Sequence, residues 1–279
     1  MDVYTLDQLD RLKRPTIFLL GVFDGVHLGH QYLLSCASAL SRAKGMPTAA
    51  LALSISPQAI MAGCGEQSVL TPPSHKKDLL EEHGLSILIE TTFTAEMQAM
   101  SARSFLELLE HKCLIDTWVV GSDVGFGKDR GGNRLFLEEY VAIREQSALF
   151  IERRCFQGEP ISSTSVRESL SQGDIERVSQ LLGRSYTFRA SVTTSEKTPY
   201  GQTLFHLDRS NMCLPKDGLW RAQIVGKSGD ALLYIQGESC LLLTQIKGED
   251  SIEVMPKSYV RSVYGSWKEL LAEEKALCC

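Results

Sequence analysis

The sequence has no long apolar run and no excess of basic residues. None of its runs approaches the roughly 18 apolar residues that a membrane-spanning helix needs, so we expect no membrane partner. Its 29 Lys and Arg stand against 34 Asp and Glu, a net charge of −5. That balance disfavours a general affinity for nucleic acid and leaves only a local basic pocket open. Residues 1–14 mix acids and bases without an apolar core, and we expect no signal peptide there.

The eight cysteines form no C-x-x-C pair and no Cys/His cluster at metal-ligand spacing. We therefore predict reduced, mostly buried thiols in a cytoplasmic protein, with neither a disulfide framework nor a structural zinc site. Internal repeats and low-complexity segments are absent as well. At 279 residues the chain is long enough for two domains.

Up to about residue 183, apolar runs alternate with amphipathic stretches. Strands separated by helices of this length predict an α/β domain with a doubly wound parallel sheet and helices on both faces. Gly45 and Gly84 follow two of the helices as C-caps. The predicted strands are 16–23, 49–55, 87–93, 117–123 and 148–155, and the predicted helices are 30–45, 74–84, 101–112 and 133–146.

After Gly183 the pattern becomes short, β-rich and divided by turn residues. It predicts a small antiparallel β-barrel or sandwich, closed by a C-terminal helix over residues 259–277. We place the domain boundary between residues 184 and 185. The predicted strands are 185–194, 202–208, 219–225, 231–237 and 239–247.

The most informative stretch is GVFDGVHLGH, residues 21–30, directly after the first apolar run. Gly21 and Gly25 permit a tight turn, and Gly29 lets a base or a phosphate approach the backbone. A helix begins here, and its N-terminus is an anion site. His27 and His30 lie three positions apart on one face of its first turn, so both can reach the same anion.

Two imidazoles over a helix N-terminus suit a phosphate whose charge grows during a reaction. Because this stretch supplies no covalent nucleophile, the simplest mechanism is direct displacement at the phosphorus, without a covalent intermediate on the protein. Two other interpretations remain open. The histidines can be structural, one capping and one packing, or they can bind a metal, although no third ligand stands at helical spacing.

Two further segments carry groups that suit a nucleotide. In residues 161–170, ISSTSVRESL, three hydroxyls begin a helix and Arg167 follows one turn later, a set that suits the β and γ phosphates of ATP. In residues 121–133, GSDVGFGKDRGGN, Asp123 can hold a ribose or adenine group, while Lys128 and Arg130 can meet phosphate. A capping box and an ordinary exposed turn are the structural alternatives.

These three segments, in this order, resemble the motifs of the bacterial FAD synthetases. That family belongs to the nucleotidylyltransferases marked by a histidine–x–glycine–histidine motif. Residues 172–186, QGDIERVSQLLGRSY, extend the similarity, which covers 16–186. The resemblance implies that His27 and His30 are catalytic, and it assigns no metal ligand. It implies nucleotide contacts at Gly21, Phe23, Asp24, Gly25, Gly29, Asp123, Phe126, Gly127, Arg130, Ser162, Ser163, Thr164 and Arg167.

By this resemblance the chain is expected to be an ATP:FMN adenylyltransferase. The phosphate of FMN would attack the α-phosphorus of Mg²⁺-bound ATP, and pyrophosphate would leave toward Ser163, Thr164 and Arg167. Asp24 would orient the loop or a metal-bound water. The expected partners are therefore ATP and FMN, with Mg²⁺ as cofactor, and the oligomeric state stays open.

The sequence departs from the family's pattern at two places. The family's F-x-P-H-P stretch reads Leu53-Ser-Ile-Ser-Pro57 here, so Ser56 replaces its histidine, and Val124 replaces an aromatic residue. Typical members also carry a riboflavin kinase barrel with G-F-P-T-A-N, whose P-T-A-N core reads His206-Leu-Asp-Arg209 here. Residues 185–279 are thus expected to be a degenerate kinase-like barrel. The alternatives are a bifunctional enzyme that also phosphorylates riboflavin, another nucleotidylyltransferase with a different phosphorylated acceptor, and a non-catalytic flavin- or nucleotide-binding protein.

Overall fold

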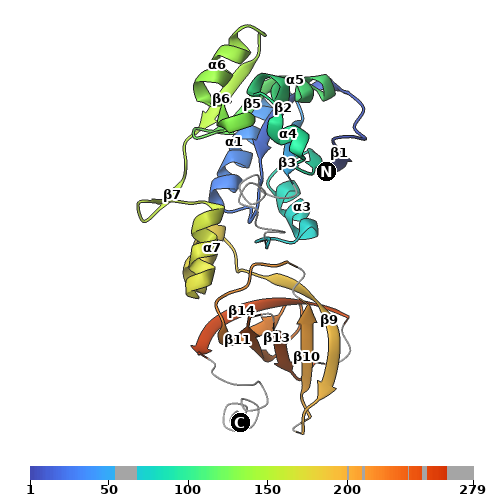
Figure 1. Cartoon of the computed structure of the whole chain (residues 1–279), viewed down its shortest axis with the longest axis vertical. Coiled ribbons are helices and arrows are strands. Elements are labelled where there is room, and N and C mark those ends of the chain that lie inside the picture. The colour runs from blue at the N-terminus through green and yellow to red at the C-terminus, as the bar shows by residue number, and fades with distance from the viewer. Residues whose placement is uncertain (54–67, 200, 209–210, 238, 247–249, 263–279) are drawn as a thin grey trace. The chain divides into compact units, whose positions relative to one another are not determined.

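The computed structural model describes residues 1–53, 68–199, 201–208, 211–237, 239–246 and 250–262. The chain forms two compact units, Met1–Ser163 and a second from Thr164 onward (Figure 1). The functional boundary expected between residues 184 and 185 stays a prediction.

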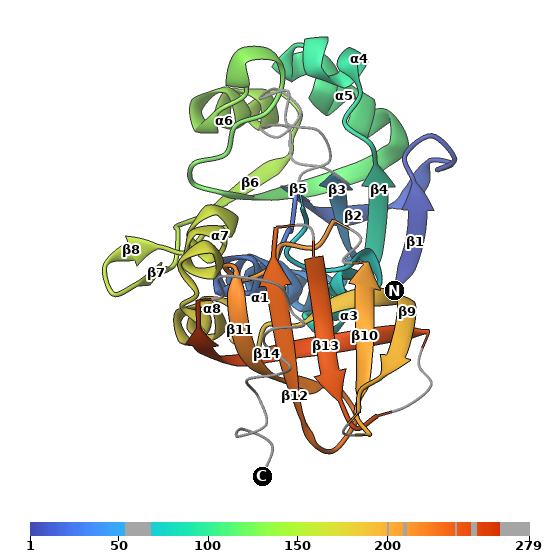
Figure 2. The ribbon, with the colours of Figure 1, turned by 60° about the horizontal axis from the view of Figure 1, so that its bottom comes forward.

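The first unit is a parallel sheet with helices on both faces (Figures 1 and 2). The strand order is β1-β4-β3-β2-β5-β6, and every neighbouring pair is parallel. The doubly wound sheet predicted from the alternating pattern is confirmed. The elements are β1 (Asp2–Thr5), β2 (Leu12–Gly21), α1 (Leu28–Lys44), β3 (Thr48–Leu53), α3 (Pro73–Glu82), β4 (Ile87–Thr91), α4 (Ala95–Ala99), α5 (Ala102–Lys112), β5 (Cys113–Gly121), a 3₁₀ turn (Lys128–Arg130), α6 (Arg134–Ala142), β6 (Ser147–Ile151) and the hairpin β7 (Cys155–Phe156) and β8 (Glu159–Pro160).

Alternate residues of the strands face the two helix layers, as the two-residue period of a strand requires. In β2, Ile17 and Leu19 pack with buried residues of α1 and α3, whereas Phe18 packs with buried residues of α5 and α6. All three side chains are fully buried. A strand covered on both faces must be apolar throughout, which is why the run at 16–20 shows no alternation.

The order of the strands places a topological switch point beside β2. β3 and β4 lie on one side of β2, and β5 and β6 lie on the other. Leu19 is in register with Val119 of β5, and both strands end two residues later, at Gly21 and Gly121. In sheets of this kind, ligands bind beyond the carboxyl ends of the strands at such a point.

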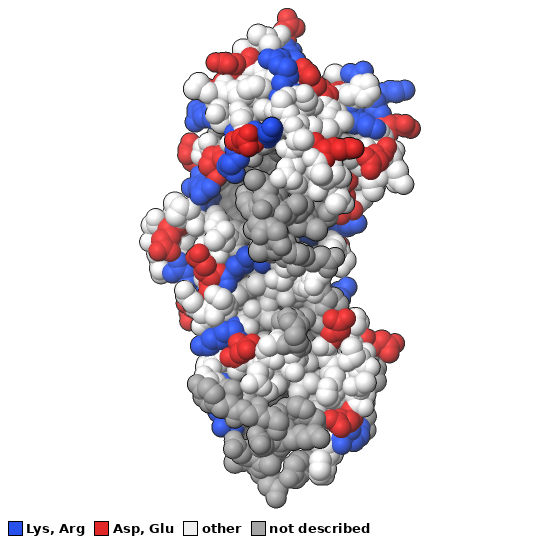
Figure 3. Space-filling view, viewed as in Figure 1, with Lys and Arg blue, Asp and Glu red and all other residues white. Residues whose placement is uncertain are grey.

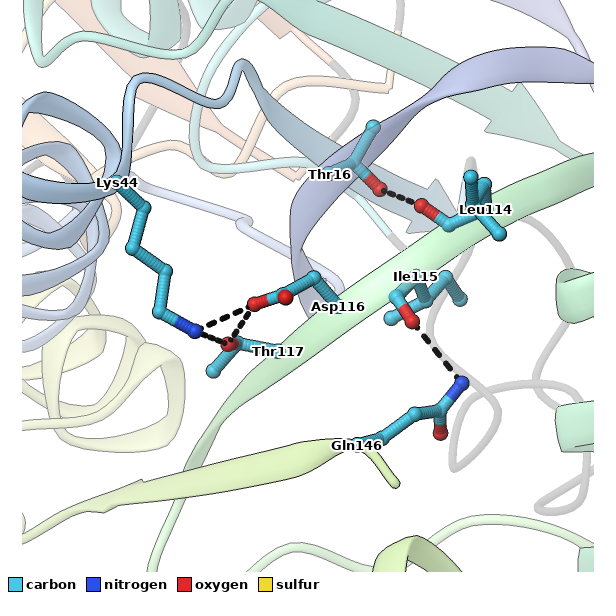
Figure 4. Close-up of polar contacts among 7 residues, drawn as sticks. All are labelled: Thr16, Lys44, Leu114, Ile115, Asp116, Thr117 and Gln146. Atoms are coloured by element: carbon cyan, nitrogen blue, oxygen red, sulfur yellow. Dashed lines mark hydrogen bonds and ion pairs between the residues drawn. The ribbon is translucent and has the colours of Figure 1, made fainter. Parts of the chain in front are cut away.

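Polar contacts near the other end of β5 hold β2 and α1 against it (Figure 4). The β2–β5 register shifts on either side of Thr16, whose hydroxyl donates to the carbonyl of Leu114 at 3.1 Å. The ammonium of Lys44, the last residue of α1, donates to Asp116 Oδ2 at 2.5 Å and to Thr117 Oγ1 at 3.0 Å. The hydroxyl of Thr16 thereby supplies a hydrogen-bond partner to a backbone carbonyl where the β2–β5 pairing is irregular.

The second unit contains an antiparallel barrel. The strand order is β10-β13-β12-β11-β14-β9, and β9 pairs with both β10 and β14, which closes the barrel. Of the two expectations, barrel and sandwich, the barrel is confirmed. The elements are α7 (Ser163–Gln172), α8 (Ile175–Leu182), β9 (Phe188–Lys197), β10 (Thr203–Asp208), β11 (Gly218–Ile224), β12 (Asp230–Gln236), β13 (Ser239–Thr244) and β14 (Ser251–Arg261).

The prediction of a C-terminal helix from Tyr259 is wrong for its first residues. Tyr259, Val260 and Arg261 belong to β14, where Tyr259 pairs with Trp220 of β11 and their rings meet edge to face at 5.0 Å. This cross-strand pairing overrides the amphipathic pattern. The remainder of the predicted helix lies outside the described residues. The structure adds elements that the pattern did not predict: β1, α4, the β7–β8 hairpin, α8 and most of β14.

The cysteines match the prediction of reduced, mostly buried thiols only in part. Every described cysteine is a free thiol, but only Cys113 and Cys240 are buried and Cys155 is exposed. Basic and acidic side chains are interspersed on the face shown in Figure 3. Within the described residues, no helix has both the length and the apolar character needed to span a membrane.

Candidate functional site

The loop between β2 and α1 is strained. We call residues 21–30 the histidine loop. Gly25 has a φ of 84°, and Phe23 and Val26 have φ values of 54° and 39°. Left-handed backbone at a non-glycine residue costs about 1–3 kcal/mol and is most unusual for a β-branched side chain. The side chain of Gln31 donates to the carbonyl of Val26 at 2.9 Å and thereby helps to hold this conformation.

His27 is the N-cap of α1. Its Nδ1 accepts the backbone N–H of His30 at 3.3 Å. Because Nδ1 is the acceptor, the proton of the neutral ring sits on Nε2, and that nitrogen can donate to a ligand. A Cβ at Gly29 would lie 3.1 Å from the His27 ring. Glycine at position 29 thus leaves room for the capping ring, which a larger residue would crowd.

The two predicted catalytic rings are stacked. The rings of His27 and His30 have centroids 3.7 Å apart and an interplanar angle of 17°, and the ring centroid of Phe23 lies 5.3 Å from that of His30. His30 Nδ1 is buried and has no hydrogen-bond partner among the described residues. Burial, followed by the charges of His27 and Lys76, lowers the pKa of His30 well below its usual value. The His30 ring is therefore neutral near pH 7 when no anion is bound.

Asp24 ties the histidine loop to two other segments. Its Oδ1 accepts the backbone N–H of Leu70 at 2.9 Å, and its carbonyl accepts the hydroxyl of Ser163 at 2.9 Å. The first contact holds the residues that precede α3, and the second holds the start of the ISST segment. Asp24 thus links the histidine loop to both segments, and its role toward a nucleotide or a metal-bound water stays a prediction.

We call residues 121–133 the Asp123 loop, and it follows β5. The carboxylate of Asp123 forms an ion pair with Arg153, and Arg130 donates to the carbonyl of Asp123 at 3.3 Å. Hydrogen bonding from Arg153 lowers the pKa of Asp123, so this group remains a carboxylate and an acceptor at neutral pH. The guanidinium of Arg130 fills the space beside Gly125, 2.5 Å from where a Cβ would lie.

Two predicted nucleotide-binding aromatics are buried. Phe23 is 0% exposed in the core with α1, and Phe126 is 8% exposed between Phe105 and Phe136. Gly127 has a φ of 68°, and a Cβ there would lie 2.6 Å from the backbone of Ala102. The structural role of these residues is packing beneath the two loops. Their contact with a nucleotide stays a prediction.

The ISST segment spans the division between the two units. Ser162 and Ser163 belong to the first unit, and Thr164 and Arg167 belong to the second. The structure thus brings His27, His30, Asp24 and Ser163 together in one unit. The approach of Thr164 and Arg167 to this site stays a prediction. Of the divergent F-x-P-H-P stretch, Leu53 ends β3, and Ser56 lies outside the described residues.

Within the described part of the chain, no three His, Cys, Asp or Glu side chains gather as metal ligands. The interpretation of the two histidines as a metal site therefore has no third described ligand. Magnesium usually binds one or two carboxylates and completes its shell with phosphate oxygens and water.

Residue patterns alone did not single out Leu70, Lys76 or Arg153. Leu70 contributes only its backbone N–H, for which the sequence carries no signal. Lys76 could have been found, because it precedes Leu79 and Leu80 by three and four positions and so shares their buried helix face. Arg153 follows β6, whose carboxyl end lies beside the Asp123 loop.

Comparison with known proteins shows which family the chain is similar to. The model of the FAD synthetase family matches residues 9–165. A bifunctional riboflavin kinase/FMN adenylyltransferase of Listeria monocytogenes is 26% identical over 91% of this chain and 82% of its own length. An FAD synthetase of the same organism is 28% identical over 67% of this chain and 76% of its own length.

The overall fold has also been seen before. A crystal structure described as a macrolide-efflux protein of Streptococcus pneumoniae matches with a TM-score of 0.82 at 18% identity, over 99% of this chain and 97% of that one. At this identity the likeness concerns the fold alone. The family match covers more than half of the 279 residues and includes the histidine loop and the Asp123 loop. The chain belongs to the FAD synthetase family.

Proposed function

We propose that this chain transfers the adenylyl group of ATP to FMN and releases FAD and pyrophosphate. The arrangement of His27 and His30 carries the proposal. Two stacked imidazoles lie at the N-terminus of α1, where the switch point of the sheet favours an anionic ligand. The family and the relatives support this choice of reaction.

The reaction needs no protein nucleophile. A phosphate oxygen of FMN forms a bond to the α-phosphorus of ATP as the bond from that phosphorus to the bridging oxygen breaks, and pyrophosphate leaves. The attacking phosphate is already an anion and requires no base. His27 and His30 stabilise the charge that gathers on the α-phosphoryl and leaving oxygens, a contribution of about 10²–10³ in rate for each such donor.

The other groups bind and orient the substrates. Asp123, held as a carboxylate by Arg153, accepts a hydroxyl of the ribose or the adenine amine, and Arg130 meets phosphate. Ser163, Thr164 and Arg167 receive the pyrophosphate, and the hydrogen bond from Ser163 to the carbonyl of Asp24 also holds the loop. Magnesium enters as Mg·ATP and supplies charge neutralisation on the phosphates. We place the reaction in the cytoplasm, since the described cysteines are free thiols.

A second activity, riboflavin phosphorylation, has one observation in its favour. The alignment with the bifunctional relative covers 268 residues and therefore includes the barrel. In the place of the kinase motif, however, His206 Nε2 lies 3.5 Å from Glu196 on the neighbouring strand β9. We propose adenylyl transfer as the main activity and leave the kinase to experiment.

One incubation series separates these functions. The purified chain receives Mg²⁺ and ATP with either FMN or riboflavin, and the products are resolved by chromatography. FAD from FMN alone supports the single activity, and FMN or FAD from riboflavin adds the second. If neither product forms while ATP binds, the chain is a nucleotide-binding protein and the proposed function is wrong.

The variant His30→Ala tests the site itself. It removes one charge-stabilising group, so we expect the turnover of FAD formation to fall by at least about 10²-fold, while circular dichroism shows a folded protein. A folded variant with turnover within a few-fold of the unsubstituted chain would contradict the role given to His30.

A further inference from the structure

Lys76 is a half-buried cation beside the histidine loop that the reaction as described does not use. It lies in the first turns of α3, on the helix face that carries the buried Leu79 and Leu80. The start of α3 is held to the loop, because Asp24 Oδ1 accepts the N–H of Leu70. Lys76 is close enough to Asp24 and His30 for their charges to act on one another.

The neighbouring anions are engaged elsewhere. Glu90, at the end of β4, forms its ion pair with Lys77 at 3.0 Å. Asp24 already accepts the Leu70 amide. Within the described residues, Lys76 forms no ion pair shorter than 4.0 Å, and burial lowers its pKa despite the two carboxylates. A cation that is taken out of water without a close counter-ion is costly, unless a ligand supplies the anion.

His30 and the start of α1 offer further groups to an anion held by Lys76. His30 Nδ1 is buried and without a partner among the described residues, and His30 stands in the first turn of α1, at the positive end of that helix. The neutral rings offer hydrogen-bonding nitrogens, while the ammonium of Lys76 and the N-terminus of α1 supply positive charge. A polyphosphate complements this set, and a lysine binds it as a compact point charge with three donors.

We propose that Lys76 is a further phosphate-binding residue of this site, and that its ammonium holds oxygens of the ATP triphosphate beside His30. The inference rests on the proposed function for the identity of the nucleotide. It assigns to α3 a part in binding that none of the three sequence motifs contains.

Calorimetric titration of the full chain tests the proposal through binding alone. Lys76→Met keeps the apolar stem and removes the charge. Because a hydrogen bond to a charged group contributes about 1.5–3 kcal/mol, we expect Mg·ATP and inorganic pyrophosphate to bind about ten- to a hundredfold more weakly. Adenosine, which has no phosphate, should bind with unchanged affinity.

Lys77→Met is the matched control, because Lys77 is the next residue of the same helix and pairs with Glu90. We expect it to bind Mg·ATP within about twofold of the unsubstituted chain. Unchanged binding of pyrophosphate and Mg·ATP by Lys76→Met would overturn the proposal, as would an equal loss for adenosine, which would indicate a structural role.

The role of Lys76 and the proposed function can fail independently, and the measurements distinguish the two failures. A chain that binds Mg·ATP through Lys76 but forms no FAD would leave Lys76 assigned and the adenylyl transfer wrong. A chain that forms FAD, and whose Lys76→Met variant binds pyrophosphate normally, would leave the transfer assigned and Lys76 out of the site.

Discussion

Substituting His27 separates two roles that the structure gives to one ring. Its Nδ1 caps α1 through the N–H of His30, and its Nε2–H is the group that we assign to the phosphate. Asparagine is among the best N-cap residues and has a side-chain oxygen but no imidazole. His27→Asn therefore keeps the cap and removes the proposed donor, whereas His27→Ala removes both.

The magnitudes follow from these contacts. Loss of an N-cap costs about 1 kcal/mol, and loss of a stacked ring contact such as that between His27 and His30, 3.7 Å apart, costs about 0.5–1.5 kcal/mol more. We expect His27→Ala to lower the free energy of unfolding by about 2 kcal/mol and His27→Asn by about half as much. Both should lower the turnover by about 10²–10³.

The measurements are urea unfolding followed by circular dichroism and the steady-state rate of FAD formation at saturating Mg·ATP and FMN. Ser101→Ala, which removes the N-cap of α5 on the opposite face of the sheet, is the control for cap loss alone. It should lose about 1 kcal/mol of stability and keep its turnover. If His27→Asn turned over within a few-fold of the unsubstituted chain, the ring would be a cap only and the reasoning would be refuted.

Three other measurements test the environment of the site. The pKa of His30 is lowered, so below about pH 6.5 the unfolded state takes up a proton that the folded state does not, and the free energy of unfolding decreases as the pH is lowered, by up to about 1.4 kcal/mol per pH unit. His30→Gln should lose this pH dependence, and His111→Gln, at an exposed position, should keep it. Equal pH dependence in the two variants would contradict the burial of the His30 ring. Gly127→Ala combines a left-handed φ with a backbone clash, so it should lower the free energy of unfolding by about 1–3 kcal/mol more than Gly45→Ala, where the φ of 65° acts alone. Urea unfolding measures both variants, and equal losses would show that the clash at position 127 is absent. Burial raises the pKa of Cys113 to about 12, so iodoacetamide at pH 8 should alkylate the exposed Cys155 and spare Cys113 in site-resolved mass spectrometry, and equal labelling would show that Cys113 is accessible.

The sequence predicted the elements whose signals are local. The apolar runs of β2–β6, the helix periodicity and Gly45, which ends α1 with a φ of 65°, depend on neighbouring residues only. Cap residues and repeats of two or 3.6 positions can be read without knowledge of the fold. The position of GVFDGVHLGH between a strand and a helix followed in the same way.

Short or exposed elements were not predicted because their sequence patterns are weak. β1 has four residues, all exposed, and depends on pairing with β4. Tyr259–Arg261 carry a helical pattern, but pairing with β11 makes them strand. In both cases a partner distant in the sequence decides the conformation, which no local window contains.

By itself the sequence determined that a doubly wound sheet presents two histidines, three positions apart, where its first long strand meets a helix. Only the tertiary structure decided that the two rings stack, that Asp24 draws Leu70 and Ser163 to the loop, and that the charge of Lys76 acts on His30. The physical reason is the distance along the chain over which each interaction acts. Turn and helix preferences act over a few residues, whereas the hydrogen bonds that hold the histidine loop join segments up to 139 positions apart along the chain.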